Sequence, residues 1–160
     1  MAYQLKVDGL AELSETLQKM GDDAQKVAAA ALYDGAGIVA DELKKAAETI
    51  KTEPFRYARN GQRLPSPEEK DIVVKAGTGI AKFDKDGDGV NTSVGYRKAG
   101  YADLNGKQKP VPLIVNSINS GTSFMKKQPF VRKAASSGGK RALEAMKAKI
   151  ESAFENMTKK

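Results

Sequence analysis

The sequence contains no cysteine, no histidine and no tryptophan. Without Cys and His, the chain cannot build a thiolate or imidazole metal site, a Cys nucleophile, a His-based catalytic triad or a disulfide. A Ser-Lys or two-carboxylate mechanism would need only residues that are present, but no spacing in the chain points to one. We therefore expect neither an enzyme nor a bound cofactor.

Long apolar runs are also missing. No stretch reaches the roughly 18 apolar residues that a membrane helix needs, and the first residues contain no apolar core of a signal peptide. The sequence predicts no membrane segment and no secretion through a signal peptide. At 160 residues, the chain is expected to form a single domain over residues 1–160.

The positive charge is unevenly distributed. The formal net charge is +7, and residues 126–160 contain ten Lys or Arg against three Glu, so residues 1–125 are neutral. A basic segment of this kind can contact phosphates, can bind an acidic partner, or can simply be solvated.

Apolar periodicity predicts the first elements. Alternating residues over 3–7 indicate a half-buried strand, and an apolar stripe over residues 10–20 indicates a short helix. Asp22 or Asp23 can cap a longer helix that runs to about Ile50.

The long helix has an unusually small surface at residues 28–31 and 35–37. These alanines and glycines allow another backbone to approach closely, although each glycine costs roughly 1 kcal/mol in helix propensity. Two interpretations follow: tight packing on the subunit's own sheet, or a helix at a subunit interface.

Residues 51–70 contain prolines and glycine and show no helical or strand period, which predicts a long loop. Phe55, Arg56, Tyr57 and Arg59 interleave aromatic and basic side chains within it. This loop can become ordered against a neighbouring subunit, or it can bind single-stranded nucleic acid by stacking and charge.

Residues 72–76 and 91–96 are expected to be strands of one hairpin. Between them, Asp84, Asp86 and Asp88 match the first half of a calcium-binding loop. The second half does not match, because Gly95 occupies the position of the bidentate Glu. The acidic run is therefore interpreted as a polar hairpin tip, with adventitious calcium binding as the alternative.

The last third begins with a second expected loop at residues 97–112. The apolar segment 113–118 is either a short helix or a strand. A C-terminal helix is expected over residues 140–158. Phe130 and Val131 point away from its apolar stripe at 100° per residue, and the Ser and Gly residues at 136–139, which lie between the two sets, permit a kink or break.

Residues 120–130 join the β-rich region to this helix. Gly121 tolerates a positive φ, and hydroxyls at 122 and 123 can satisfy turn backbone groups. Pro129 suits a first helical turn. Two aromatics flank the turn, and Phe130 is interpreted either as a core anchor or as an interface residue. The segment's expected interface residues are Gly121, Thr122, Ser123, Phe124, Pro129 and Phe130.

This Gly-Thr-Ser turn, followed by Pro-Phe and the small pair Ala134-Ala135, resembles the signature of tailed-phage neck proteins. That family includes the tail-completion and head-tail joining proteins similar to minor tail protein Z. Residues 7–13 also resemble the family's opening strand and first helix, and residues 51–110 match least. Asn119-Ser120 departs from the family, which often has a Glu and an aromatic there.

The resemblance implies an α+β fold, in which a small antiparallel sheet packs with a long helix of the N-terminal half and a C-terminal helix, with long extended loops. It implies a structural virion protein that forms a hexamer or dodecamer ring at the head-tail junction, assembled in the bacterial host cytoplasm. Such a ring completes or terminates the tail, contacts connector, stopper and tail-tube proteins, and lets DNA pass through its lumen without sequence readout. Which ring of the neck it forms stays open. The alternative is a small basic nucleic-acid-binding protein.

Overall fold

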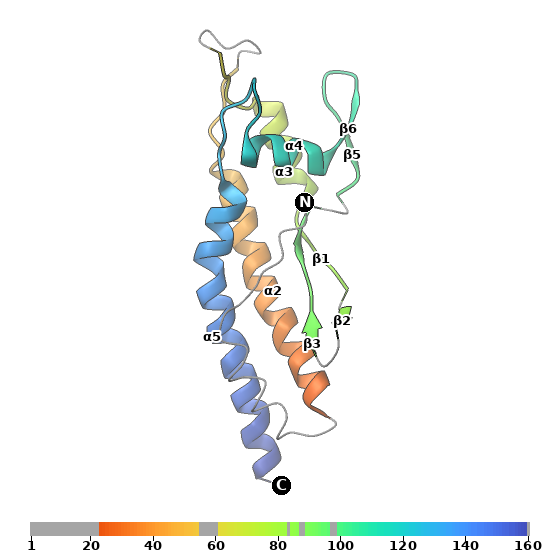
Figure 1. Ribbon diagram of the computed structural model, residues 1–160, viewed down its shortest axis with the longest axis vertical. Helices are drawn as coiled ribbons and strands as arrows, with labels where there is room; N and C mark the ends of the chain where they lie inside the picture. The colour runs from red at the N-terminus through yellow and green to blue at the C-terminus, as the bar shows by residue number, and fades with distance from the viewer. Residues whose placement is uncertain (1–22, 55–60, 83, 87–88, 97–98, 160) are drawn as a thin grey trace.

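Two long helices that run side by side in opposite directions form the long axis of the molecule (Figure 1). They are α2 (Ala24–Glu48) and α5 (Phe130–Thr158). The computed structural model describes residues 23–54, 61–82, 84–86, 89–96 and 99–159. Two short helices and three antiparallel ladders complete this described part, which confirms the α+β class. The expected elements at residues 3–7 and 10–20 lie outside it.

Helix α2 begins and ends close to the predicted residues. Asp23 is its N-cap residue, but the Asp23 side chain pairs with Lys26 (3.0 Å) and makes no capping hydrogen bond. The small surface of α2 is used within the subunit: a Cβ on Gly35 would lie 2.9 Å from the Met146 side chain of α5. At this position the small residue therefore accommodates the subunit's other long helix, and not its sheet.

The prediction of a strand at residues 72–76 is wrong, because these residues belong to helix α3 (Pro67–Ala76). Ser66 Oγ accepts the Glu69 N–H (3.2 Å) while Glu69 Oε2 accepts the Ser66 N–H (2.8 Å), and Pro67 occupies the first turn. This capping box and the preset proline φ favour a helix more strongly than the β-branched residues favour a strand. It also shortens the expected loop of residues 51–70, since α3 begins within that range.

The β structure consists of separate two-stranded ladders. β1 (Gly79–Ile80) pairs with β4 (Val94–Gly95), and β2 (Asp84–Asp86) pairs with β3 (Gly89–Asn91), so both ladders belong to one long hairpin. The expected second strand, residues 91–96, is present only as the short pieces β3 and β4. Asp84 and Asp86 lie on β2, in the second of these two ladders.

The loop expected at residues 97–112 is also wrong. It contains a second hairpin, formed by β5 (Tyr101–Asp103) and β6 (Gln108–Pro110). Leu104 and Lys107 are hydrogen-bonded to each other and close the turn of this hairpin. The two residues between them, Asn105 and Gly106, both have positive φ, at 60° and 74°. This geometry is that of a type I′ turn, for which Asn-Gly is the strongest short sequence signal.

The apolar segment at 113–118 is helical, as part of α4 (Val111–Ser120). Its buried residues recur at helical spacing, and Pro112 in the first turn requires no backbone hydrogen bond. The buried residues of α4 belong to one large core cluster, together with residues from the end of α2, from α3 and from the start of α5.

Helix α5 begins ten residues before the expected start at residue 140 and is continuous, so the break that residues 136–139 permit does not occur. A Cβ on Gly138 would lie 3.3 Å from the Glu42 side chain and 3.5 Å from the Val39 Cα, so this glycine allows α2 to approach closely. The apolar residues of α5 still fall into two sets, as their phases predict. Phe130 packs in the large cluster, and Met146 packs in a second cluster between α2 and α5. A helix of 29 residues can reach both.

Of the helices in the described part of the chain, none combines the length and apolar character needed to cross a bilayer.

Candidate assembly surface

Gly121 ends α4 and starts the segment that leads to α5. Its φ is +77° and its ψ is 170°, a region that only glycine occupies without strain. A Cβ at this position would lie 2.8 Å from the Lys127 Cβ and 3.1 Å from the Lys127 N and Cα. The backbone of residues 121–127 therefore folds back on itself, and the closeness requires glycine.

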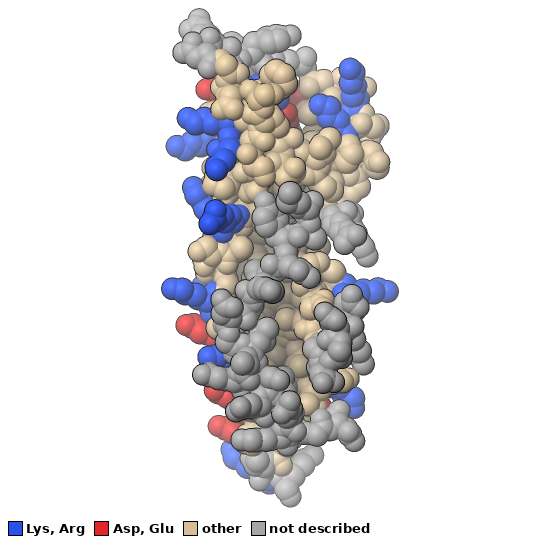
Figure 2. Space-filling view, viewed as in Figure 1, with Lys and Arg blue, Asp and Glu red and all other residues tan. Residues whose placement is uncertain are grey.

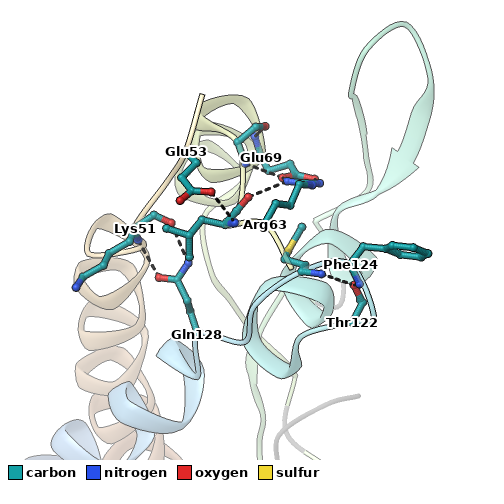
Figure 3. A network of polar contacts seen from close by, with 10 residues as sticks. Lys51, Glu53, Arg63, Glu69, Thr122, Phe124 and Gln128 are labelled. Carbon is teal, nitrogen blue, oxygen red and sulfur yellow. Dashed lines mark hydrogen bonds and ion pairs between the residues drawn. The ribbon is translucent and has the colours of Figure 1, made fainter. Parts of the chain in front are cut away.

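The Thr122 hydroxyl shapes the tip of this segment. Its Oγ1 accepts the backbone N–H groups of Phe124 (3.2 Å) and Met125 (3.0 Å), and the Thr122 N–H donates to the Met125 carbonyl (3.0 Å). The Met125 side chain is buried, whereas Phe124 points away from the polar network (Figure 3) and is 74% exposed. The turn thus displays one large aromatic ring to solvent.

Gln62 and Arg63, which are distant in sequence, hold the segment of residues 121–127 in place. The Arg63 N–H donates to the Phe124 carbonyl (2.9 Å) and the Lys126 N–H donates to the Arg63 carbonyl (2.8 Å). The Gln62 side chain adds a hydrogen bond from Nε2 to the Thr122 carbonyl (2.9 Å). These three bonds hold the backbone on both sides of Phe124.

Arg63 is itself held by a carboxylate (Figure 3). Its two terminal nitrogens each donate to one oxygen of Glu69, both at 2.7 Å. Burial acts to raise the pKa of Glu69, but the hydrogen bonds from Arg63 and Ser66 and the charges of Arg63 and Lys109 outweigh it and lower this pKa below its usual value. The Glu69 carboxylate therefore couples the capping box of α3 to the position of Arg63.

Gln128 joins the end of α2 to the start of α5. Its Oε1 accepts the Lys51 N–H (2.9 Å), and its Nε2 donates to the Lys51 carbonyl (2.8 Å) (Figure 3). The Gln128 backbone N–H donates to the Ile118 carbonyl of α4 (2.8 Å). One residue thus ties together three helices.

Phe130 is a core anchor. It is 3% exposed and meets the Tyr96 ring edge-on, with ring centroids 6.5 Å apart. Burial raises the pKa of the Tyr96 hydroxyl to about 12. Beside it, the buried Asn119 Oδ1 accepts the Val131 N–H (3.1 Å), which satisfies one free donor in the first turn of α5. Of the two flanking aromatics, only Phe124 is therefore available to a partner.

Three large apolar side chains form what we call the apolar rim: Phe124, Leu113 and Tyr101. Leu113 is 56% exposed and Tyr101 is 71% exposed. Tyr101 pairs with Pro110, directly before α4, Leu113 lies in the first turn of α4, and Phe124 follows its C-terminal end. Single exposed apolar residues are ordinary, but these three come before, within and after one short helix, and we take them together as the candidate interaction surface.

Of the remaining predicted site residues, Ser123 is exposed and Pro129 is the N-cap residue of α5. Phe55, Arg56, Tyr57 and Arg59 lie outside the described residues, as does Asp88. Asp84 and Asp86 lie on β2, and only their backbone is described. No group of three or more potential metal ligands occurs within the described ranges, which leaves the calcium interpretation of Asp84, Asp86 and Asp88 a prediction.

Sequence reasoning missed the residues that hold the segment in place: Gln62, Arg63, Glu69, Asn119 and Gln128. The Ser66-x-x-Glu69 spacing is a capping-box signal and could have identified the start of α3. No local pattern could identify the others, because their partners are distant in sequence.

The sequence model of one protein family, described as "Bacteriophage HK97-gp10, putative tail-component", matches residues 11–104. The match covers more than half of the chain. It includes α2, α3 and the long hairpin, and therefore most of the region where the resemblance to neck proteins is weakest. It ends before α4 and the segment of residues 121–130. Neither a curated protein nor a solved structure matches the chain.

Proposed function

Because this chain belongs to the HK97-gp10-like family of bacteriophage tail components, we propose that its subunits form a ring at the head-tail junction. The chain is a structural phage tail component, and its place is in the virion. In the proposed assembly, a hexamer or dodecamer completes or terminates the tail and leaves a channel for DNA. The connector or stopper and the tail tube are its proposed neighbours, as they are for proteins similar to minor tail protein Z.

The observation that carries the proposal is the exposure of Phe124. The Phe124 ring is 74% exposed, and the backbone on both sides of it is hydrogen-bonded to residues 62 and 63 and to Thr122. A rigidly displayed aromatic side chain is a typical hot spot of a protein interface, because little conformational entropy is lost when it is buried.

A ring requires two different surfaces on each subunit. Repeating one heterologous contact around an axis closes a ring when the rotation allows it. The apolar rim provides one such surface at one end of the two long helices. The proposed mechanism is therefore binding without chemistry, and the whole chain acts as one domain in it.

The experiment is native mass spectrometry and light scattering of the purified protein over a concentration series, with imaging of any large species. We expect a closed hexamer or dodecamer. Phe124→Ser should shift the assembly toward the monomer and leave the folded subunit intact. The matched control is Met157→Ser, which removes an exposed apolar side chain (37%) near the other end of α5.

Two results would count against the proposal. A strict monomer at every concentration, which also ignores added tail tubes, would remove the ring. If Phe124→Ser and Met157→Ser assembled to the same extent, the apolar rim would not be the interface of the ring.

A further inference from the structure

The surface over the first half of α5 is strongly basic. Figure 2 shows Lys and Arg side chains gathered along the edge where the upper part of α5 lies. We call this surface the basic face and define it by six exposed residues: Lys51, Lys126, Lys127, Arg132, Lys133 and Lys140. Residues 126–141 contain six cations and no acid, so nearly all of the net charge of +7 arises there.

The fold brings these cations together from three segments. The two hydrogen bonds between the Gln128 side chain and the Lys51 backbone hold the end of α2 beside the start of α5. On α5, Arg132, Lys133 and Lys140 fall within about 100° of each other around the helix. Lys140 lies about 10 Å further along the helix than Lys133, and the exposed Ser136 lies between them.

Other cations of α5 have acidic partners. Arg141 pairs with Glu42 (2.7 Å) and Lys149 pairs with Asp34 (2.7 Å). None of the ion pairs among described residues involves the basic face. The first turn of α5 contains no acidic residue that could pair with these cations. The positive end of the helix dipole also disfavours cations at this position. The basic face therefore does not serve the stability of its own subunit.

Association between copies of the chain does not lower its net charge per subunit. Each subunit adds a further +7, so a homomeric ring becomes more positive as it grows. Such a ring attracts anions and polyanions, and the basic face is where six exposed cations lie together.

The residue types distinguish between polyanions. Five of the six cations are Lys, a flexible point charge, and one is Arg. Protein interfaces are enriched in Arg and depleted of Lys, whereas both Lys and Arg contact the phosphate oxygens of DNA, and those contacts carry no sequence information. Hydroxyls such as that of Ser136 also bind phosphate oxygens. The composition therefore favours a phosphate backbone over an acidic protein.

We propose that the basic face binds the phosphate backbone of double-stranded DNA without reading its sequence. The inference rests on the proposed function only for where DNA is met, namely the lumen of the ring. Binding itself requires the folded subunit alone.

The test measures binding of a fluorescein-labelled mixed-sequence duplex of 30 base pairs by anisotropy, between 50 and 300 mM NaCl. Each phosphate neutralised contributes about −0.9 to the slope of log K against log salt, so six cations limit the slope to about −5. The variant Lys126→Gln/Lys127→Gln/Arg132→Gln/Lys133→Gln should make the slope shallower by up to about 3.6 and weaken binding at least about tenfold at 50 mM.

The matched control removes the same charge elsewhere: Lys44→Gln/Lys82→Gln/Lys107→Gln/Lys159→Gln. These four lysines are exposed and lie outside the basic face. We expect this control to retain most of the wild-type affinity, and both variants to keep the thermal melting curve of the wild type.

Equal losses in the two variants would overturn the proposal, because they would show a response to net charge alone. So would the absence of DNA binding at 50 mM NaCl combined with binding of labelled poly-L-glutamate, which would identify an acidic protein as the partner. The mass of each variant is measured in parallel. A strict monomer that ignores added tail tubes but binds DNA through the basic face would refute the ring and keep this inference. A ring that does not bind DNA would keep the ring and refute this inference.

Discussion

Gly121→Ala is the substitution whose cost can be best worked out from the structure. Two effects add. An L-residue at φ +77° and ψ 170° is strained by about 1–3 kcal/mol. In addition, the new Cβ would lie 2.8 Å from the Lys127 Cβ and 3.1 Å from two Lys127 backbone atoms, and such overpacking costs about 1–3 kcal/mol. We expect Gly121→Ala to lower the free energy of unfolding by about 2–6 kcal/mol.

Gly77→Ala is the matched control. Gly77 also follows the last residue of a ten-residue helix, and its backbone angles, φ 67° and ψ 172°, are nearly the same. A Cβ there would meet nothing within 4 Å, so only the backbone strain of about 1–3 kcal/mol remains. The difference between the two variants isolates the steric contribution of Lys127.

The assay is equilibrium urea denaturation at a concentration where the subunit is monomeric. With an m-value of about 2 kcal/mol/M, an extra 2 kcal/mol lowers the midpoint by about 1 M and leaves m unchanged. Equal midpoints for the two variants would refute the reasoning, because the fold-back of residues 121–127 would then impose no steric demand. A loss for Gly121→Ala below about 1 kcal/mol would refute the strain argument as well.

Three further predictions follow from burial, charge and helix propensity. Phe130→Ala should lower the free energy of unfolding by about 3–5 kcal/mol, because its ring is 3% exposed, whereas Phe124→Ala should change it by less than about 0.5 kcal/mol; similar urea midpoints would contradict this assignment of core and surface. The folded-state pKa of Glu69 lies below its usual value of 4.5, so its contribution to stability is present above about pH 4.5 and is lost as the pH falls through the lowered pKa. Urea midpoints measured from pH 7 to 3 should fall less for Glu69→Gln than for the wild type, while Glu68→Gln, at an exposed neighbouring position, should follow the wild-type curve; parallel curves for all three proteins would exclude Glu69 as a source of the acid sensitivity. Gly37→Ala should raise the free energy of unfolding by about 0.5–1 kcal/mol, because Gly37 lies within α2 and a Cβ there would meet nothing within 4 Å; a lower thermal midpoint would show that this face of α2 is not free.

Much of the fold was predictable where local rules agree with tertiary packing. The bounds of α2, the helix over residues 140–158, and the separation of Phe130 from the later apolar stripe of α5 all follow from apolar spacing at 3.6 residues per turn. The predictions for residues 72–76 and 97–112 were wrong although local signals existed. The capping box at Ser66 and the Asn105-Gly106 turn carry that information, and β-branched content and polarity are weaker signals than either.

The candidate site was predictable only in outline. Sequence reasoning identified the segment of residues 121–130 and the need for glycine at 121, but it could not separate the exposed Phe124 from the buried Phe130. That separation depends on Tyr96, which packs against Phe130, and on Arg63, which holds the backbone beside Phe124. Both partners are distant in sequence, and side-chain periodicity carries no information about such contacts.

The sequence by itself excluded disulfides and any site that needs Cys or His, and it determined the helical spacing and the uneven charge. These properties depend only on which residues are present and on the intervals between them. Only the tertiary structure decided which glycines of α2 and α5 allow the other helix to approach closely, which aromatic is displayed, and which cations lack an acidic partner. The physical reason is that close approach, burial and ion pairing are properties of pairs of residues. In this chain the pairs that matter, such as Lys51 with Gln128 and Glu42 with Arg141, lie 77 and 99 residues apart.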